Sequence, residues 1–96
     1  MKLGQIISSV RKEKGYKQGV LAKELGITQT YLSQIERDKK EPNLSLLKKI
    51  ANVLRIPLPI IFFFALEAND LPESKREIFN NIFPEAKDLI MSSLLN

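Results

Sequence analysis

The sequence predicts an all-α protein, a five-helix bundle with a C-terminal helical extension. Apolar residues recur at spacings of three and four along nearly the whole chain, and no segment alternates apolar with polar residues as a half-buried strand would. Glycine or proline follows most of these periodic segments. The chain has 96 residues, 44% of them apolar and 27% charged, which indicates one domain with a short appended element.

The first two helices are predicted over residues 2–14 and residues 17–25. In the first, four aliphatic residues lie at helical spacing with basic residues on the other side, and Gly15 follows as a stop signal. In the second, two leucines and an alanine form a short apolar face, and Gly26 ends the helix. Each helix therefore has one face suited to a core.

A third helix is predicted over residues 29–37, with the hydroxyl of Thr28 as its cap. Leu32 and Ile35 face inward, and the opposite face carries hydrogen-bonding, mostly uncharged side chains, namely Gln29, Thr30, Ser33, Gln34 and Arg37. A glutamine amide can pair with N6 and N7 of adenine, and a hydroxyl can donate, accept or touch a thymine methyl group. A solvated surface more usually carries glutamate and lysine, so we interpret this face as suited to the major groove of DNA.

A fourth helix is predicted over residues 44–54, after a charged loop that Pro42 closes. Asn43 is placed to cap its first turn. Apolar positions repeat every three or four residues and form one stripe. The residues expected to face inward are Leu44, Leu47, Ile50, Ala51 and Leu54.

A fifth, short helix is predicted from about Pro57 to Leu66, because proline is tolerated in a first helical turn. Residues 60–66 are apolar on every side, which is more apolar surface than one bundle can cover. They must therefore also pack on residues 73–95, on a second subunit, or on both.

The strongest boundary in the chain is Asn-Asp-Leu-Pro at residues 69–72, so we assign residues 1–66 to the bundle and residues 67–96 to the extension. Helical periodicity continues to the end, but Pro84 interrupts it, which predicts two helices or one kinked helix. We expect a dimer or partner interface built from apolar residues of the C-terminal third: Ile60, Phe63, Phe64, Ile78, Phe79, Ile82, Phe83, Leu89, Ile90 and Leu94.

Composition excludes several classes of function. There are no cysteines and no histidines, which removes disulfides, thiolate nucleophiles, zinc fingers and most imidazole chemistry. No phosphate-binding loop, catalytic carboxylate pair or metal-ligand spacing is visible, so we expect no enzyme activity, no metal and no cofactor. No apolar run could span a bilayer and no signal-peptide pattern is present, so we expect a cytoplasmic protein without a membrane partner.

Charge is distributed unevenly along the chain. Residues 1–55 hold 12 basic and 5 acidic residues, whereas residues 56–96 hold 3 basic and 6 acidic residues. The N-terminal half therefore attracts a polyanion, and nucleic acid is the natural candidate.

The second and third predicted helices also resemble a known family. The matching residues are Gln18, Leu21, Ala22, Leu25, Gly26, Ile27, Thr28, Tyr31, Leu32, Ser33, Ile35, Glu36 and Arg37, and the pattern continues through Pro42, Leu47, Ala51 and Leu54. This stretch closely resembles the Cro/C1-type (XRE) helix-turn-helix family, whose members are similar to lambdoid phage repressors and restriction–modification controller proteins. The resemblance implies a five-helix DNA-binding domain encoded by a bacterium or phage. Asp38 stands where the family usually has glycine, although aspartate tolerates a left-handed backbone better than most residues.

The resemblance also implies roles for individual residues. The residues expected to contact DNA bases are Thr28, Gln29, Thr30, Ser33 and Gln34. The residues expected to contact the DNA backbone, which fix register without reading sequence, are Gln18, Tyr31, Arg37, Lys39, Lys40 and Asn43. Arg11 and Glu36 are expected to form a structural ion pair between the first and third helices. Lys39 and Lys40 could instead form an ordinary charged loop, and Asn43 could act as a cap, a DNA contact or both.

The favoured interpretation is a transcriptional regulator, a repressor that occludes a promoter, which binds a pseudo-palindromic operator in double-stranded DNA as a homodimer. Activation through contact with the polymerase is equally compatible with the sequence. An antitoxin-type regulator, whose C-terminal helices bind a protein partner, is a variant of the same idea. The alternative from another class is an interaction adaptor on the same fold that does not bind DNA.

Overall fold

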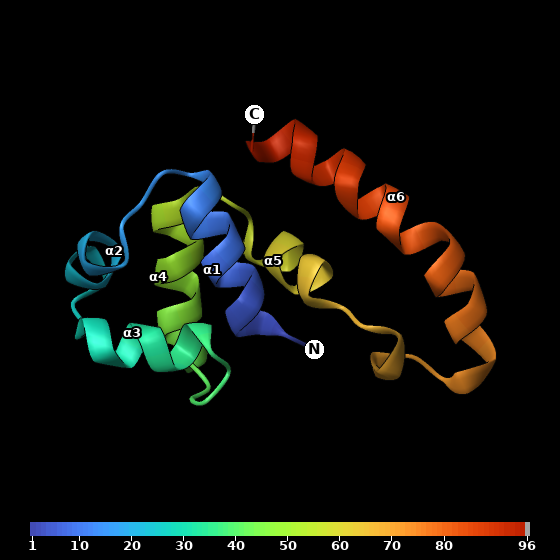
Figure 1. Ribbon diagram of the computed structural model, residues 1–96, viewed down its shortest axis with the longest axis horizontal. Coiled ribbons are helices and arrows are strands. Elements are labelled where there is room, and N and C mark those ends of the chain that lie inside the picture. Colours follow the sequence, from blue (N-terminus) through green and yellow to red (C-terminus); the bar gives the residue numbers. More distant parts are fainter. Residues whose placement is uncertain (96) are drawn as a thin grey trace.

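The computed structural model describes residues 1–95, and every regular element in this range is helical (Figure 1). The predicted all-α class is therefore confirmed. The elements are α1 (Leu3–Glu13), α2 (Gln18–Leu25), α3 (Gln29–Glu36), α4 (Leu44–Leu54), α5 (Leu58–Ala65), the short 3₁₀ helices η1 (Ala68–Asp70) and η2 (Glu73–Lys75), and α6 (Arg76–Leu95). All five predicted bundle helices are present, with ends within one residue of those expected.

The apolar stripes of α1 to α5 meet in one core. Helix α1 contacts α3, α4 and α5, and α2 packs on α3 and α4. Leu32 and Ile35 of α3 are completely buried, as predicted. They hold α3 by its inner face, so its opposite face remains at the surface of the protein.

The predicted inward stripe of α4 is wrong at one position. Leu44 is 56% exposed, whereas Leu46 is buried with Leu47 in the core. Leu44 is the residue that opens the helix, directly after the cap residue Asn43. Its side chain therefore lies at the helix end and not along the stripe that the bundle covers.

Helix α6 continues as a single helix through Pro84. Proline has no N–H to donate to the carbonyl of Asn80, and this loss commonly bends a helix. The ribbon of α6 curves along its length (Figure 1). Of the two predicted alternatives, the structure therefore has one helix, and it is curved.

Helix α6 lies on the α5 side of the molecule, away from α2 and α3 (Figure 1). The ring centroids of Phe63 in α5 and Phe83 in α6 are 5.1 Å apart, and Phe79 stacks on Phe83 at 4.4 Å. Further along α6, Ile90 and Met91 pack against the core. Part of the apolar surface of α5 is therefore covered by the chain's own C-terminal helix, one of the arrangements the sequence predicted.

One residue assigned to a partner interface is not available to a partner. Phe64 is only 1% exposed, because it lies with Ile61 and Ala65 on the face of α5 that is turned into the bundle. The sequence could not distinguish the faces of a helix that is apolar all round. The assignment of Phe64 to an interface is therefore corrected to the core.

The outer face of α6 remains apolar and exposed. Ile82 is 60% and Leu89 70% exposed, and Ile78 and Leu94 are also exposed. Beside this face lies a groove of about 390 Å³, lined almost entirely by carbon atoms of Phe63, Leu66, Leu71, Lys75, Ile78, Phe79, Ile82, Phe83 and Ala86. Exposed apolar surface of this kind commonly marks an interaction site.

The amino group of Met1 ties the start of the chain to the segment before α6. It lies 3.0 Å from a carboxylate oxygen of Glu67 and 3.0 Å from one of Asp70. Glu67 and then Asp70 raise the pKa of this amine above its usual 8.0. The backbone N–H of Glu67 and then the Met1 amine lower the pKa of the Asp70 carboxyl below its usual 3.8.

Candidate nucleic-acid interface

A tight turn joins α2 to α3. Gly26 ends α2 with a positive φ of 72°, a conformation that glycine adopts without strain. The N–H of Ile27 donates to the carbonyl of Ala22 at 3.0 Å, and the hydroxyl of Thr28 accepts from the N–H of Tyr31 at 3.0 Å. Both helix ends at the turn are therefore capped, and α3 leaves it in a defined direction.

The outer face of α3 brings together most of the residues predicted to read bases. Gln29 and Thr30 are exposed and Ser33 and Gln34 are half-buried. A shallow hollow of about 370 Å³ is lined by Gln18, Gln29, Thr30, Ser33 and Arg37. Thr28 lies at the start of the same helix, and because its oxygen already accepts the capping bond, its hydroxyl hydrogen remains to donate.

The predicted ion pair between Arg11 and Glu36 is present and buried. The Nε atom of Arg11 donates to Oε2 of Glu36 at 2.7 Å, and Nη2 donates to Oε1 at 2.9 Å. The remaining terminal nitrogen of Arg11 donates to the carbonyl of Tyr16 at 2.8 Å. Two parallel charge-assisted bonds fix both distance and angle, so they hold the last turn of α3 against α1.

A chain of amides extends from this ion pair to the outer face of α3. The amide nitrogen of Gln18 donates to Oε1 of Glu36 at 3.1 Å, and that of Gln29 donates to the amide oxygen of Gln18 at 3.4 Å. The side chain of Gln29, which is predicted to read a base, is thus oriented through Gln18 by Glu36. Sequence reasoning assigned Gln18 only to the DNA backbone and missed this role, since only tertiary packing brings α1, α2 and α3 within hydrogen-bonding distance.

The residues predicted to contact the DNA backbone surround this face. Arg37, Lys39 and Lys40 are exposed in and before the loop that leads to α4, and Tyr31 is half-buried. No ion pair among residues 1–95 engages Arg37, Lys39 or Lys40, so these charges remain available to phosphates. Asn43 acts as the cap of α4, because its side-chain oxygen accepts from the N–H of Leu46 at 2.8 Å.

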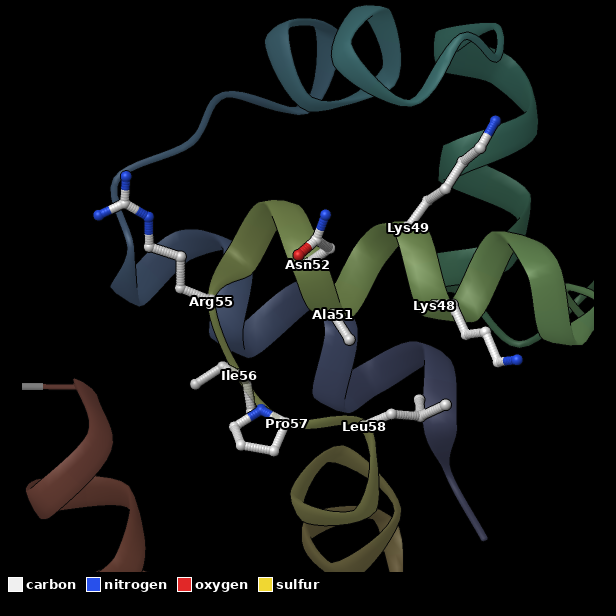
Figure 2. Close-up of a pocket in the computed structure, with 8 residues that line it drawn as sticks. All are labelled: Lys48, Lys49, Ala51, Asn52, Arg55, Ile56, Pro57 and Leu58. Atoms are coloured by element: carbon white, nitrogen blue, oxygen red, sulfur yellow. The ribbon is translucent and has the colours of Figure 1, made fainter.

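A second, larger hollow lies where α4 meets α5 (Figure 2). It measures about 670 Å³ and is lined by Lys48, Lys49, Ala51, Asn52, Arg55, Ile56, Pro57 and Leu58. Figure 2 shows the charged ends of Lys48, Lys49 and Arg55 pointing away from one another. Cations that diverge in this way do not form one anion site, so the outer face of α3 is the stronger candidate.

The described part of the chain offers neither a metal site nor a membrane-spanning helix. Within residues 1–95 no cluster of acidic side chains is arranged to hold a metal ion. No helix in that range is both long and apolar enough to cross a membrane.

Comparison with known families identifies the class of protein. A family model described as "Helix-turn-helix" matches residues 7–61, which is more than half of the chain. The chain therefore belongs to the helix-turn-helix family of the XRE type, a family of transcriptional regulators and not of enzymes. The match ends inside α5, so α6 lies outside it.

Individual relatives agree with this family. The chain is 42% identical over 60 residues to the ImmF control region 10 kDa protein of Bacillus phage phi105, covering 62% of this chain and 67% of that protein. It is 39% identical over 61 residues to the immunity repressor protein of the same phage, covering 64% of this chain and 42% of the repressor. It is 42% identical over 55 residues to the HTH-type transcriptional regulator SinR of Bacillus subtilis (strain 168), covering 56% and 50% of the two chains. The chain thus spans half or less of the latter two relatives.

A solved structure matches nearly the whole chain. The clp gene regulator ClgR from Corynebacterium glutamicum superimposes with a TM-score of 0.66 and covers 99% of this chain and 93% of its own. The identity is 21%, so this likeness concerns the fold. It extends to the C-terminal helix that the family model leaves out.

Proposed function

We propose that this chain is a sequence-specific regulator of transcription that binds double-stranded DNA through the outer face of α3. The observation that carries the proposal is the row of exposed Gln29, exposed Thr30 and half-buried Gln34 on a helix whose other face is anchored in the core. Amides and hydroxyls can read base edges in the major groove, and they do so best when their helix cannot shift. The amide chain from Glu36 to Gln29 supports the proposal, because it orients one reading side chain in advance.

The charges around α3 support binding to the DNA backbone. Arg37, Lys39 and Lys40 flank the reading face and are exposed. Contacts from such residues to phosphates fix the register of a protein on the duplex and release counterions. We propose that Gln18, Tyr31 and Asn43 complete this set of backbone contacts.

We further propose that the protein acts as a homodimer on a pseudo-palindromic operator. One recognition helix reads only a few base pairs, and a two-fold dimer doubles that readout over half-sites about 34 Å apart. The apolar face of α6 with Ile78, Ile82 and Leu89 supplies surface that a second subunit could cover. This face lies at the other end of the molecule from α3, so pairing there leaves the reading face accessible (Figure 1).

Repression by occlusion of a promoter is the proposed outcome of binding. The relatives support this direction, since one is an immunity repressor and others are transcriptional regulators. Because these relatives come from Bacillus and its phages, we place the protein in the cytoplasm of a bacterium. A second candidate, favoured by the apolar groove on α6, is an antitoxin-type regulator in which another protein occupies that groove.

Selection of binding sites from genomic DNA, followed by titration of single variants, tests the proposal. Gln29→Ala and Gln34→Ala should each weaken binding to the selected operator by about 1–3 kcal/mol and relax the preference at one base pair. Lys40→Ala should instead weaken binding to all sequences alike and reduce the salt dependence by roughly one unit of slope. Lys49→Ala, at an exposed lysine of α4 that is not among the proposed DNA contacts, is the matched lysine control and should change little.

Two results would count against the proposal. A Gln29/Thr30/Gln34 triple alanine variant with full operator affinity would show that another surface reads the DNA. Absence of salt-sensitive DNA binding by the unmodified chain would favour an interaction adaptor on this fold.

A further inference from the structure

Asp38 has an unusual backbone conformation and an unusual partner. It follows the last turn of α3 and has a positive φ of 57°, a backbone conformation that residues other than glycine, asparagine and aspartate rarely adopt. Its carboxylate oxygen Oδ1 accepts a hydrogen bond of 2.8 Å from the backbone N–H of Gly4, 34 residues earlier in the chain. The bond therefore connects the end of the recognition helix to the start of α1.

Both partners of this bond are suited to it. Gly4 lies in the first turn of α1, where backbone N–H groups have no partner within the helix, and Lys2 supplies no side-chain cap. A methyl group on Gly4 would lie only 2.0 Å from the carbonyl oxygen of Ile35 and 2.7 Å from Oδ1 of Asp38. Only glycine permits this close approach of α1 to α3. The negative charge of Asp38 also lies at the positive end of the α1 dipole, so Asp38 caps α1 from a distant part of the chain.

The same residue begins the loop that carries the candidate phosphate contacts. The N–H groups of Lys39 and Lys40 donate to the carbonyl of Gln34 at 2.9 and 3.3 Å, so this loop moves with the last turn of α3. Between the loop and α1 lies a cavity of about 380 Å³, lined by Met1, Leu3, Gly4, Asp38, Lys40, Glu41, Pro42 and Leu47. Because side-chain packing across this cavity is incomplete, the hydrogen bond from Gly4 to Asp38 helps to attach the loop to α1.

Two attachments therefore hold the end of α3 to α1. Gly4 binds Asp38, and Arg11 binds Glu36. Gly4 and Arg11 are separated by about 10 Å along α1, at 1.5 Å per residue. One attachment alone would let the end of α3 pivot, whereas two that are separated in this way resist rotation.

We propose that Asp38 is a positioning residue for DNA recognition, which holds Gln34 and the loop of Lys39 and Lys40 in the orientation that base reading requires. The inference rests on the proposed function of the outer face of α3. Hydrogen bonds to base edges depend more strongly on the orientation of α3 than the attraction between lysine and phosphate does. Loss of the Asp38 attachment therefore lowers the affinity for an operator more than the affinity for unrelated DNA.

The test compares three variants of the full chain. Asp38→Gly removes the attachment and relieves the backbone strain at a positive φ. Asp38→Asn keeps an oxygen acceptor and tolerates the same backbone, so it should rescue the attachment. Arg55→Gly is the matched control, because Arg55 also has a φ of 57° and lies outside the reading face.

The measurements separate the attachment from its effect on DNA. Hydrogen exchange of the Gly4 amide should be roughly tenfold faster in Asp38→Gly than in the parent and close to the parent in Asp38→Asn. In Asp38→Gly, the affinity for the operator should fall roughly three- to tenfold, while the affinity for unrelated DNA should stay within about twofold of the parent's value. Asp38→Asn and Arg55→Gly should keep the parent's affinity for the operator. Thermal unfolding of each variant checks that the fold is intact.

The inference is overturned if Gly4 exchange is unchanged in Asp38→Gly, since the attachment would then not exist in solution. It is also overturned if exchange accelerates and operator affinity stays at the parent's value, or if operator and unrelated DNA lose affinity equally. If the parent selects no operator at all, the proposed function fails together with the specificity effect, and the Gly4 exchange measurement still tests the attachment.

Discussion

Replacing Arg11 by methionine tests how much the buried ion pair stabilises the bundle. Methionine preserves most of the volume of the arginine stem but removes the three hydrogen bonds to Glu36 and to the carbonyl of Tyr16. The side chain of Glu36 is only 5% exposed, so its carboxylate would remain buried without a cation. Removing one partner of a buried ion pair lowers the free energy of unfolding by about 3–5 kcal/mol.

The structure places the expected loss at the lower end of that range. Gln18 would still donate one hydrogen bond to Glu36, which leaves the carboxylate partly satisfied. We therefore expect Arg11→Met to lower the free energy of unfolding by about 3 kcal/mol, a large share of the roughly 5–15 kcal/mol typical of a small domain. This corresponds to a fall in Tm of roughly 12–24 °C.

Urea unfolding followed by far-ultraviolet circular dichroism measures this loss. The double variant Arg11→Met/Glu36→Leu is the matched control, because it removes both charges together and should recover much of the lost stability. Its operator affinity should nevertheless stay low, since Gln18 then has no carboxylate to orient it. A loss below about 1 kcal/mol in the single variant, or a double variant less stable than the single one, would refute the reasoning.

The remaining predictions concern α6 and the chain start. Ile82→Glu and Leu89→Glu should abolish dimerisation in sedimentation experiments and leave the helical signal unchanged, because both side chains are exposed within one chain; an unchanged dimer would place the interface elsewhere. Pro84→Ala should raise the stability of α6 by up to about 3 kcal/mol, measured by hydrogen exchange, since it restores a helical N–H, and a loss of stability would contradict this. The pKa of the Asp70 carboxyl, measured by nuclear magnetic resonance, should lie below 3.8. The contact between this carboxylate and the Met1 amine should therefore weaken as the pH falls through the lowered pKa of Asp70, and also as the pH rises through the raised pKa of the amine, which lies above 8.0. A pKa of Asp70 at or above 3.8 would contradict the contact.

Much of the candidate site could be predicted from local sequence. Leu32 and Ile35 occupy inward positions, and Gln29, Thr30 and Gln34 lie opposite them, because helical periodicity alone assigns residues to faces. The positive φ of Asp38 was expected only through the family resemblance, which has glycine at this position, and not from local sequence. The connection of Gln18 to Glu36 and Gln29 could not be predicted in this way, since no spacing within one helix encodes which side chains of three helices meet.

In the C-terminal part of the chain, tertiary packing decided more than local sequence could predict. The helical pattern after residue 72 predicts α6, but the prediction that Phe64 belongs to an interface is wrong. A helix that is apolar all round carries no sequence signal for its buried side. Only the packing of α5 between α1 and α6 distinguishes Phe64 from Phe63.

Local chemistry in the chain thus determines the helices, the caps of α3 and α4 and the polar row on α3, because these depend on residues within about one helical turn of each other. Tertiary structure alone determines which helix ends are joined, as in the bonds of Asp38 to Gly4 and of Gln18 to Glu36. Those bonds link residues far apart in sequence, and they form only after the apolar stripes have packed and excluded water from between the helices.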